Sequence, residues 1–280
     1  MTKNNDNNST DPSKPVGLRN VMALGLVSFF TDFSTEMVLG ILPMFIVSNL
    51  GASRAALGAI EGSAELVSYA FRMVSGSISD KVGKRKIFIL AGYGLSTISK
   101  PFLAITATWQ EAFLVRTGDR IGKGLRTAPR DALIADSVYE SSSGKAFGLH
   151  RTIDQMGAIA GPVAAFALLQ IMDIRGIFLV SLIPGAVAVI ILIFFVKEVV
   201  IKSGIANRTT SIFSNIGTVI IANRPFVILL LVTGLFNLGA YNFSFVLLRA
   251  SDLGVQEDFI PIVFAIINVT HAVTGILQAF

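Results

Sequence analysis

Charged side chains lie inside stretches of the sequence that are otherwise apolar. Asp32 and Glu36 are one helical turn apart in the first stretch. Glu61, Glu65 and Arg72 fall within about 40° of one another on a helix in the second stretch. A charged side chain at the centre of a lipid bilayer costs about 2.5–3.5 kcal/mol. We therefore expect these residues to face a protein interior or a water-filled cavity, where they can bind a solute or carry a proton.

Further charges occur in two later stretches, at Arg116 and Arg120 and at Asp154. Acids on the first two helices are expected to face these bases across a shared cavity. Asp32 and Glu36 have no base nearby on their own helix, which favours a role in proton transfer. The pattern predicts a substrate and proton pathway of eight residues: Asp32, Glu36, Glu61, Glu65, Arg72, Arg116, Arg120 and Asp154.

Some of these charges also have plainer interpretations. Glu61, Glu65 and Arg72 equally fit a network that fixes helix register, because paired charges hold structure as well as substrate. Lys100 fits a side chain that reaches the outer surface of a membrane, and His150 fits an interfacial histidine near the end of its span.

The composition excludes several kinds of chemistry. The 280-residue chain has no cysteine and two histidines, which excludes disulfides, thiol catalysis and a histidine-rich metal site. No nucleophile motif or phosphate-binding loop is present, so a membrane-embedded enzyme is the least favoured alternative. We predict no enzyme activity, no cofactor and no metal. The net charge of +5 is expected to reflect basic residues gathered on one side of a membrane rather than nucleic-acid binding.

The elements that position these charges are long apolar blocks. The chain is 52% hydrophobic and only 15% charged, with a mean hydropathy of +0.69. Each block approaches the ~20 residues with which a helix crosses ~30 Å of hydrocarbon. The sequence therefore predicts an all-α polytopic membrane protein, with apolar blocks at 19–48, 55–79, 86–106, 147–170, 176–196, 225–248 and 259–280.

The polar stretch 109–131 decides the topology. If it crosses the membrane, most of the 23 lysines and arginines fall on the side of the N-terminus, which satisfies the positive-inside rule. We predict a buried helix whose charges face an aqueous interior. Gly118 and Gly122 are expected to let another helix approach closely, and Pro129 is expected to mark the end of the helix.

Four segments follow from this pattern. We predict a disordered cytoplasmic tail at 1–18, a six-helix bundle at 19–196, a cytoplasmic linker with an amphipathic helix at 197–224, and the first two helices of an incomplete second bundle at 225–280. The sequence stops inside an apolar run, so we expect a fragment whose C-terminal half is missing.

The loop between the second and third blocks carries the sharpest motif, Gly76-Ser-Ile-Ser-Asp80-Lys81-Val-Gly83-Lys84-Arg85-Lys86. Gly76 is expected to allow close helix contact, Asp80 to lie on a helix N-terminus, and Gly83 to relieve a turn. The basic residues from Lys84 to Lys86 are expected to meet anionic lipid headgroups.

This loop resembles the signature of the major facilitator superfamily. The Arg120-x-x-x-Gly124 pattern resembles the fourth-helix motif of that family, although Arg116 lies one turn away and either arginine could be the match. The segment from Gly157 to Pro162 resembles the fifth-helix motif associated with exporters, and the basic run 119–131 looks like a drug-efflux-like subgroup. The resemblance implies gating roles for eight residues: Gly76, Asp80, Gly83, Lys84, Arg85, Gly157, Gly161 and Pro162.

The resemblance also implies a function. We expect transmembrane transport of a small organic solute by alternating access, in the form of proton-coupled export by an antiporter of the multidrug or metabolite efflux type. The expected location is the plasma membrane, with a cytoplasmic N-terminus. The expected partners are the solute, protons, the lipid bilayer and a missing C-terminal half, with no nucleic acid. The alternative is a half-transporter or truncated fragment without activity of its own.

Overall fold

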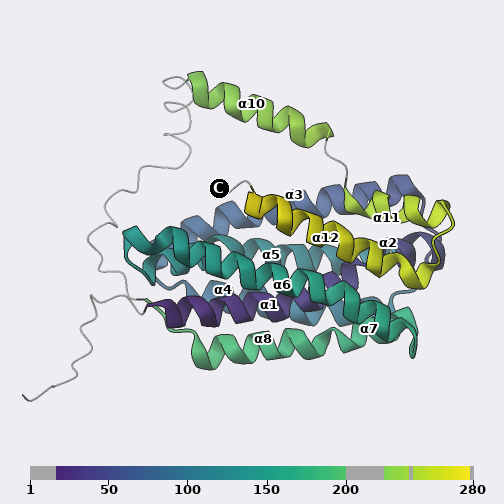
Figure 1. The fold of residues 1–280 in the computed structure, drawn as a ribbon, viewed down its shortest axis with the longest axis horizontal. Coiled ribbons are helices and arrows are strands. Elements are labelled where there is room, and N and C mark those ends of the chain that lie inside the picture. Colours follow the sequence, from purple (N-terminus) through teal and green to yellow (C-terminus); the bar gives the residue numbers. More distant parts are fainter. Residues whose placement is uncertain (1–16, 200–223, 240–241, 278–280) are drawn as a thin grey trace, which may run out of the picture.

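A computed structural model describes residues 17–199, 224–239 and 242–277 (Figure 1). Regular structure in these ranges is helical throughout. The first bundle contains α1 (Leu18–Leu39), α2 (Leu42–Met44), the π-helical turn η1 (Phe45–Asn49), α3 (Arg54–Val82), α4 (Lys86–Ser99), the 3₁₀ turn η2 (Lys100–Ile105), α5 (Trp109–Asp136), η3 (Glu140–Ser142), α6 (Ser143–Leu169), α7 (Ile174–Val180) and α8 (Leu182–Phe195). Beyond it lie α10 (Arg224–Gly239), α11 (Phe243–Asp252), η4 (Glu257–Phe259) and α12 (Ile260–Leu277).

Local sequence signals set several helix boundaries. The Ser53 hydroxyl accepts a hydrogen bond from the Ala56 N–H and caps the start of α3. Thr108 and Glu111 form a reciprocal capping box at the start of α5. α3 ends at Gly83, whose φ of 68° is the left-handed conformation that glycine adopts readily. The turn expected at Gly83 is therefore confirmed.

Within the described part of the chain, five helical stretches are long and apolar enough to cross a membrane: Leu18–Asn49, Lys86–Ile105, Glu140–Leu169, Ile174–Phe195 and Glu257–Thr274. α3 and α5 are also long enough to cross a membrane, but their charged residues make them too polar to belong to this set. The segment 109–131 is nevertheless one continuous helix, which extends through Pro129 to Asp136. The prediction that Pro129 ends this helix was wrong, because a proline removes only one backbone hydrogen bond and the buried helix tolerates that loss.

The bundle has two ends, here called the Gly17 end and the Gly51 end after the glycines that lie there. At the Gly17 end the chain enters α1 and turns at Gly83 and Ser137. At the Gly51 end it turns at Gly51 and Asp173. α1, α3, α5 and α6 all run from one of these ends to the other, and α1 and α6 run in the same direction (Figure 1).

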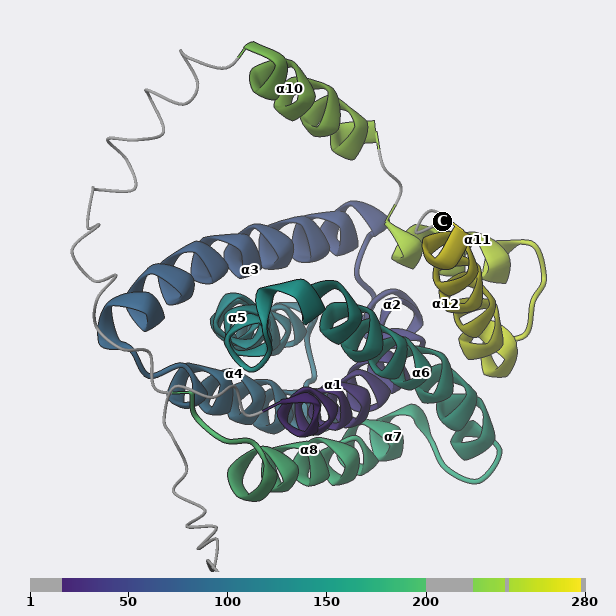
Figure 2. The ribbon, with the colours of Figure 1, turned by 60° about the vertical axis from the view of Figure 1, so that its left-hand side comes forward.

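A few helix pairs make most of the contacts in the bundle. α5 lies against α3 and α4, α1 lies against α6 and α8, and α12 lies against α6 (Figure 2). A Cβ atom added to Gly122 would lie 2.6 Å from the Gly92 carbonyl oxygen, and one added to Gly118 would lie 3.0 Å from Ser99 Oγ. The close helix approach predicted for Gly118 and Gly122 is confirmed, and α4 is the helix that approaches.

Two sequence predictions fall wholly or mainly outside the described residues. The amphipathic helix predicted within 197–224 lies in the range 200–223, and the predicted tail lies mostly in 1–16. Gly17 and Leu18, at the end of the predicted tail, belong to the bundle instead. The Gly17 N–H donates a hydrogen bond to the Ser137 carbonyl oxygen at 2.8 Å, and α1 starts at Leu18.

Candidate functional site

The charges of α3 and α5 form a set of ion pairs, here called the α3–α5 network and defined as Glu61, Glu65, Arg116, Asp119 and Arg120, of which all but the half-exposed Glu65 are buried. Arg116 donates two parallel hydrogen bonds to the Glu61 carboxylate, from Nε to Oε1 at 3.0 Å and from Nη2 to Oε2 at 2.9 Å. Their side chains are 3% and 4% exposed. A two-point contact of this kind is strong and fixes geometry as well as charge.

The remaining members extend this pair in both directions. Arg116 Nη1 donates to Asp119 Oδ2 at 3.1 Å, and Ser96 of α4 donates to the other oxygen of Asp119. Arg120 lies 3.4 Å from Glu65 and 3.9 Å from Glu61. Buried charges are tolerated when they are paired in this way. Most of the network is therefore neutralised inside the protein, rather than facing water as we expected for α5.

Arg72 lies apart from this network. Its side chain is exposed, and its guanidinium carbon lies 5.9 Å from the centre of the Tyr69 ring. The predicted grouping of Glu61 and Glu65 with Arg72 was wrong. The two glutamates reach across to α5, which offers two arginines one turn apart, while Arg72 lies about two turns further along α3.

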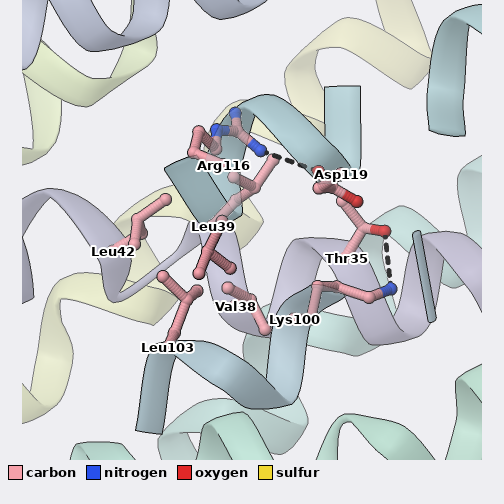
Figure 3. Close-up of a pocket in the computed structure, with 9 residues that line it drawn as sticks. Thr35, Val38, Leu39, Leu42, Lys100, Leu103, Arg116 and Asp119 are labelled. Carbon is pink, nitrogen blue, oxygen red and sulfur yellow. Dashed lines mark hydrogen bonds and ion pairs between the residues drawn. The ribbon is translucent and has the colours of Figure 1, made fainter. Parts of the chain in front are cut away.

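A small cavity adjoins the network, between α1, η2 and α5 (Figure 3). Its volume of about 10 Å³ is close to the minimum for one water molecule. Lys100 lines it and donates a hydrogen bond to Thr35 Oγ1 at 3.1 Å. The prediction that Lys100 reaches the outer surface was wrong, because this side chain is 2% exposed and points toward α1.

The contact between α1 and α6 is the closest helix approach beside the proposed pathway. A Cβ atom on Gly157 would collide with the Phe29 carbonyl oxygen, and one on Gly161 would lie 2.6 Å from the Phe33 carbonyl oxygen. Only glycine fits at such distances. Both glycines of the fifth-helix motif therefore act here as points of helix contact, and the gating role implied for them stays a prediction.

Polar groups follow this contact and form the α1–α6 seam, defined as the side chains of Ser28, Asp32 and Glu36 of α1 with those of His150 and Asp154 and the backbone carbonyl of Ala158 of α6. Asp32 and Asp154 lie close enough for their carboxyl groups to share a hydrogen bond. Arg151 lies 3.3 Å from Asp154 Oδ2, whereas the buried Asp154 Oδ1 has no hydrogen-bond donor within the described residues. Two carboxyl groups can share a hydrogen bond only when one of them holds a proton.

Glu36 meets the second bundle. Asn268 of α12 donates hydrogen bonds from Nδ2 to Glu36 Oε2 at 3.4 Å and to the Ala158 carbonyl oxygen at 2.8 Å. That carbonyl needs a donor because Pro162, four residues later, has no N–H to offer. Pro162 thus leaves an acceptor free on α6, and a side chain of α12 occupies it.

His150 lies at the opposite end of the seam. Its Nε2 atom is 3.0 Å from Ser28 Oγ, which is also 3.0 Å from the Tyr93 hydroxyl. Arg130 of α5 donates to the same Ser28 oxygen at 3.3 Å. The interpretation of His150 as an interfacial histidine was wrong, because the residue is 3% exposed and is held among four helices.

A clamp closes the Gly17 end of the bundle. Arg85 lies 3.4 Å from Asp80 and 3.1 Å from Asp136. The backbone N–H groups of Arg85 and Lys86 donate to the two carboxylate oxygens of Glu198, at 3.1 and 2.8 Å. The carboxylate at the start of α4 is therefore Glu198, not Asp80 as predicted, and it suits the positive end of the helix dipole.

The other motif residues have separate positions. Lys86 Nζ donates to the carbonyl oxygens of Ile193 and Val196 at the end of α8, so this lysine does not reach lipid headgroups as predicted. Lys84 is exposed. A Cβ atom on Gly76 would lie 3.1 Å from Ala128 Cβ, which confirms the close contact expected there.

An ion pair joins the two bundles at the Gly51 end. Arg54 Nη2 lies 2.6 Å from Asp252 Oδ1, which links α3 to α11. The hydrogen bond from Arg54 lowers the pKa of the Asp252 carboxyl. Within the described part of the chain no group of three or more His, Cys, Asp and Glu residues could hold a metal ion.

Sequence reasoning missed two residues of this arrangement. Asn268 lies inside an apolar run, where a buried amide is itself a signal that a polar partner is near. Glu198 follows directly after the apolar block 176–196, and its position there gave no indication of the turn that it caps. Both partners come from segments distant in sequence, at 36 and 158 for Asn268 and at 85 and 86 for Glu198.

Comparison with known proteins decides the family. The family model of the Major Facilitator Superfamily matches residues 24–279. The chain belongs to this superfamily. It is therefore a membrane-embedded protein of a transporter family and not an enzyme. An uncharacterized MFS-type transporter of Methanocaldococcus jannaschii is 35% identical over 286 residues, which cover 99% of this chain and 68% of that protein.

Another relative and a solved structure are also matched over only part of their own length. The multi-drug resistance efflux pump PmrA of Streptococcus pneumoniae is 29% identical over 61% of this chain and 43% of its own. A crystal structure of a D-xylose-proton symporter superposes with a TM-score of 0.64 at 17% identity, over 93% of this chain and 68% of that one. At this identity the likeness shows the fold, which is the first helical bundle followed by α10, α11 and α12 of a second bundle.

Proposed function

We propose that this protein exports a small organic solute across the plasma membrane by alternating access, in exchange for protons. One observation carries the proposal. Within the described residues no ion pair joins Asp32 or Glu36 to a base, whereas the acids of the α3–α5 network are paired. A carboxyl group inside a membrane protein that no fixed cation neutralises is suited to take up and release a proton.

The relatives support export in particular. PmrA is named as a multi-drug efflux pump, and a relative in Salmonella typhi, 25% identical over 64% of this chain, is named as a multidrug resistance protein. The helix contact at Gly157 and Gly161 is the feature that resembles exporters. The solute is accordingly a small organic molecule, held in the space between the two bundles.

The orientation follows from charge. We infer that the Gly17 end faces the cytoplasm, because Lys81, Lys84, Arg85 and Lys86 lie there, and loops on that side of a membrane are rich in lysine and arginine. The Gly51 end, with the Arg54–Asp252 pair, then faces outward. In this arrangement the ion pair between the bundles lies on the outer side.

Transport into everted membrane vesicles tests the proposal. Vesicles containing the protein would be energised with an interior-acid pH gradient and offered cationic, neutral and anionic organic dyes in turn. We expect accumulation of at least one dye that collapses when the gradient is dissipated, and loss of that accumulation in Asp32→Asn combined with Glu36→Gln. Accumulation that persists in the double variant, or that ignores the pH gradient, would refute proton coupling. Failure to accumulate any of the dyes would reject export of organic solutes of these kinds.

A further inference from the structure

The polar residues of the α1–α6 seam recur at the same interval on both helices. Ser28, Asp32 and Glu36 are spaced by four residues on α1. The first two face His150 and Asp154 of α6, which have the same spacing, and Glu36 is joined through Asn268 to the backbone carbonyl of position 158. Because the two helices run in the same direction, equal spacing keeps the pairs in register along their length. Four residues of α-helix rise about 6 Å. The seam thus contains a column about 12 Å long of three polar pairs: Ser28–His150, Asp32–Asp154 and, with α12, Glu36–Asn268.

We propose that this column is a proton relay, in which His150 passes protons between the Gly17 end and the Asp32–Asp154 carboxyl pair, and Asn268 couples the last carboxyl, Glu36, to the second bundle. This inference rests on the proposed function and goes beyond it, because it assigns a path and two residues to proton coupling. The steps of about 6 Å are too long for direct hydrogen bonds, so bridging water completes the path.

The first pair supplies the entry. An imidazole takes up a proton on one ring nitrogen to become an imidazolium, and it returns to the neutral ring when it passes a proton to a carboxylate, which becomes a carboxylic acid. His150 has its Nε2 atom at Ser28, and no hydrogen bond to its other ring nitrogen is found within the described residues. The ionisable and charged groups that face it are Tyr93 of α4, Arg130 and Asp131 of α5, and Arg151 and Asp154 of its own helix.

The second pair stores the proton. The Asp154 Oδ1 atom is buried and lacks a donor within the described residues, and the neighbouring carboxyl group is that of Asp32. A proton held between these two groups satisfies the orphaned oxygen, which otherwise loses a hydrogen bond in the interior. The charged groups around Asp32 are Glu36 of its own helix, Lys100, Lys123 and Arg126 of the neighbouring helices, and Asp154.

The third pair transmits the result. Glu36 accepts from Asn268 as a carboxylate, and an amide N–H donates more strongly to a charged acceptor than to a neutral one. Protonation of Glu36 therefore weakens one of the two hydrogen bonds that hold α12 against the seam. Lys123, Arg120 and Arg116 of α5, with Lys100, are the charged groups that face Glu36. A change of charge in the column thus alters a contact between the bundles.

A fluorescence measurement on the whole chain tests this relay without a known substrate. The chain contains no cysteine, so Ala55→Cys and Gln256→Cys at the Gly51 end accept a donor and an acceptor dye without side reaction. Both native residues are exposed. The labelled protein in liposomes would be subjected to a rapid pH change, and both the amplitude and the rate of the change in energy transfer would be recorded.

The relay predicts a different result for each variant. Gln retains a hydrogen bond to Ser28 but cannot carry a proton, so His150→Gln is expected to keep the amplitude and to slow the rate at least about tenfold. Asn268→Leu is expected to reduce the amplitude with little change in rate. Asp32→Asn is expected to abolish the response. The exposed His271 provides a matched control, and His271→Gln is expected to change neither quantity.

The outcomes separate the relay from the proposed function. If the wild-type protein shows no response to pH, proton coupling fails and the relay fails with it. If the wild type responds and Asp32→Asn does not, but His150→Gln responds at the wild-type rate, the relay is refuted and the proposed function stands. Ser28→Ala removes the Ser28–His150 hydrogen bond by a change on α1 instead of α6, and it is also expected to slow the rate. This second variant keeps the test decisive if His150→Gln does not fold. A wild-type rate in a folded Ser28→Ala protein would count against the relay.

Discussion

The α3–α5 network and the α1–α6 seam both contain acidic residues inside the protein, but the two regions differ in whether these residues have ion-pair partners. In the network, the buried Glu61 and Asp119 and the half-exposed Glu65 are matched to two arginines at distances from 2.9 to 3.9 Å. In the seam, Asp32 and Glu36 have no such partner within the described residues, and a buried oxygen of Asp154 lacks a donor. Paired charges hold helices in place, whereas unpaired carboxyl groups are free to change their protonation state.

The comparison implies that removal of one partner has different consequences in the two regions. In the network it leaves an uncompensated buried charge, which destabilises a protein by about 3–5 kcal/mol. In the seam, replacement of Asp32 or Glu36 by its amide removes a charge that has no ion-pair partner within the described residues. The expected loss there is in proton coupling and not in folding.

The largest effect is expected for Arg116. Arg116→Leu leaves Glu61 and Asp119 buried without their principal base, and we expect a loss of about 3–5 kcal/mol in the free energy of unfolding. The measurement is unfolding in mixed detergent micelles, followed by circular dichroism. The control is Arg72→Leu on the exposed side of α3, for which a change within about 0.5 kcal/mol is expected. Equal losses of unfolding free energy for the two variants would contradict the claim that the paired charges of the network stabilise the fold more than an exposed charge does.

A smaller effect is expected where the seam depends on glycine. Gly157→Ala places a methyl group against the Phe29 backbone, and we expect a loss of about 1–3 kcal/mol as α1 and α6 move apart. Gly148 lies earlier on α6 and faces open space, since a Cβ atom there would meet nothing within 4 Å. Gly148→Ala is therefore expected to be neutral or stabilising, by up to about 1 kcal/mol. The same unfolding measurement compares the two, and a tolerated Gly157→Ala would mean that the helices are not in close contact.

The clamp at the Gly17 end provides a carboxylate of a third kind, which is paired with backbone N–H groups. Glu198→Ala removes the acceptor for the first N–H groups of α4, and a loss of about 0.5–2 kcal/mol is expected. Exposed Glu140, at the start of η3, serves as the matched control, with little change expected for Glu140→Ala. Hydrogen exchange at the Arg85 and Lys86 amides measures the effect locally. Unchanged protection of these amides in Glu198→Ala would contradict the assignment.

The smallest effect is expected for the exposed ion pair at the Gly51 end. The Asp252 carboxyl has a lowered pKa because Arg54 donates a hydrogen bond to it. The contact therefore contributes fully above the unfolded-state pKa of about 3.9 and is lost as the pH falls through the lower, folded-state value. Energy transfer between dyes at positions 55 and 256 is expected to fall slightly below about pH 4 and with added salt. Asp252→Asn should lack that acidic step, and its persistence would assign the step to another group.

Much of the fold could be predicted from the sequence. The apolar blocks and the side-chain pattern of 109–131 depend only on local composition, and most of the helices follow them. The single span predicted at 225–248 was wrong, because this block is divided between α10 and α11. The end of α5 could not be predicted from Pro129, because tolerance of a proline inside a helix depends on the packing around it. The glycine contacts were predictable in kind, but the identity of the partner helix was not.

The candidate site was less predictable, because it depends on which distant residues meet. Glu61 and Glu65 were expected beside Arg72 of their own helix, yet they pair with bases of α5. Lys100 and His150 each lie near one end of an apolar block, which predicts a position at the membrane interface for both. In the bundle Thr35 and Ser28 of α1 hold them inside. A single sequence carries no signal for such pairings.

One pair of matched substitutions tests the central claim most directly. Asp32→Asn and Glu61→Gln each replace one carboxyl group by its amide, in the seam and in the network respectively. Both would be measured for thermal unfolding and for the pH-driven change in energy transfer at the Gly51 end. We predict that Asp32→Asn unfolds at the wild-type temperature and loses the response to pH, and that Glu61→Gln unfolds at a lower temperature and keeps the response while folded. The reverse result, with the response lost in Glu61→Gln and kept in Asp32→Asn, would contradict the account.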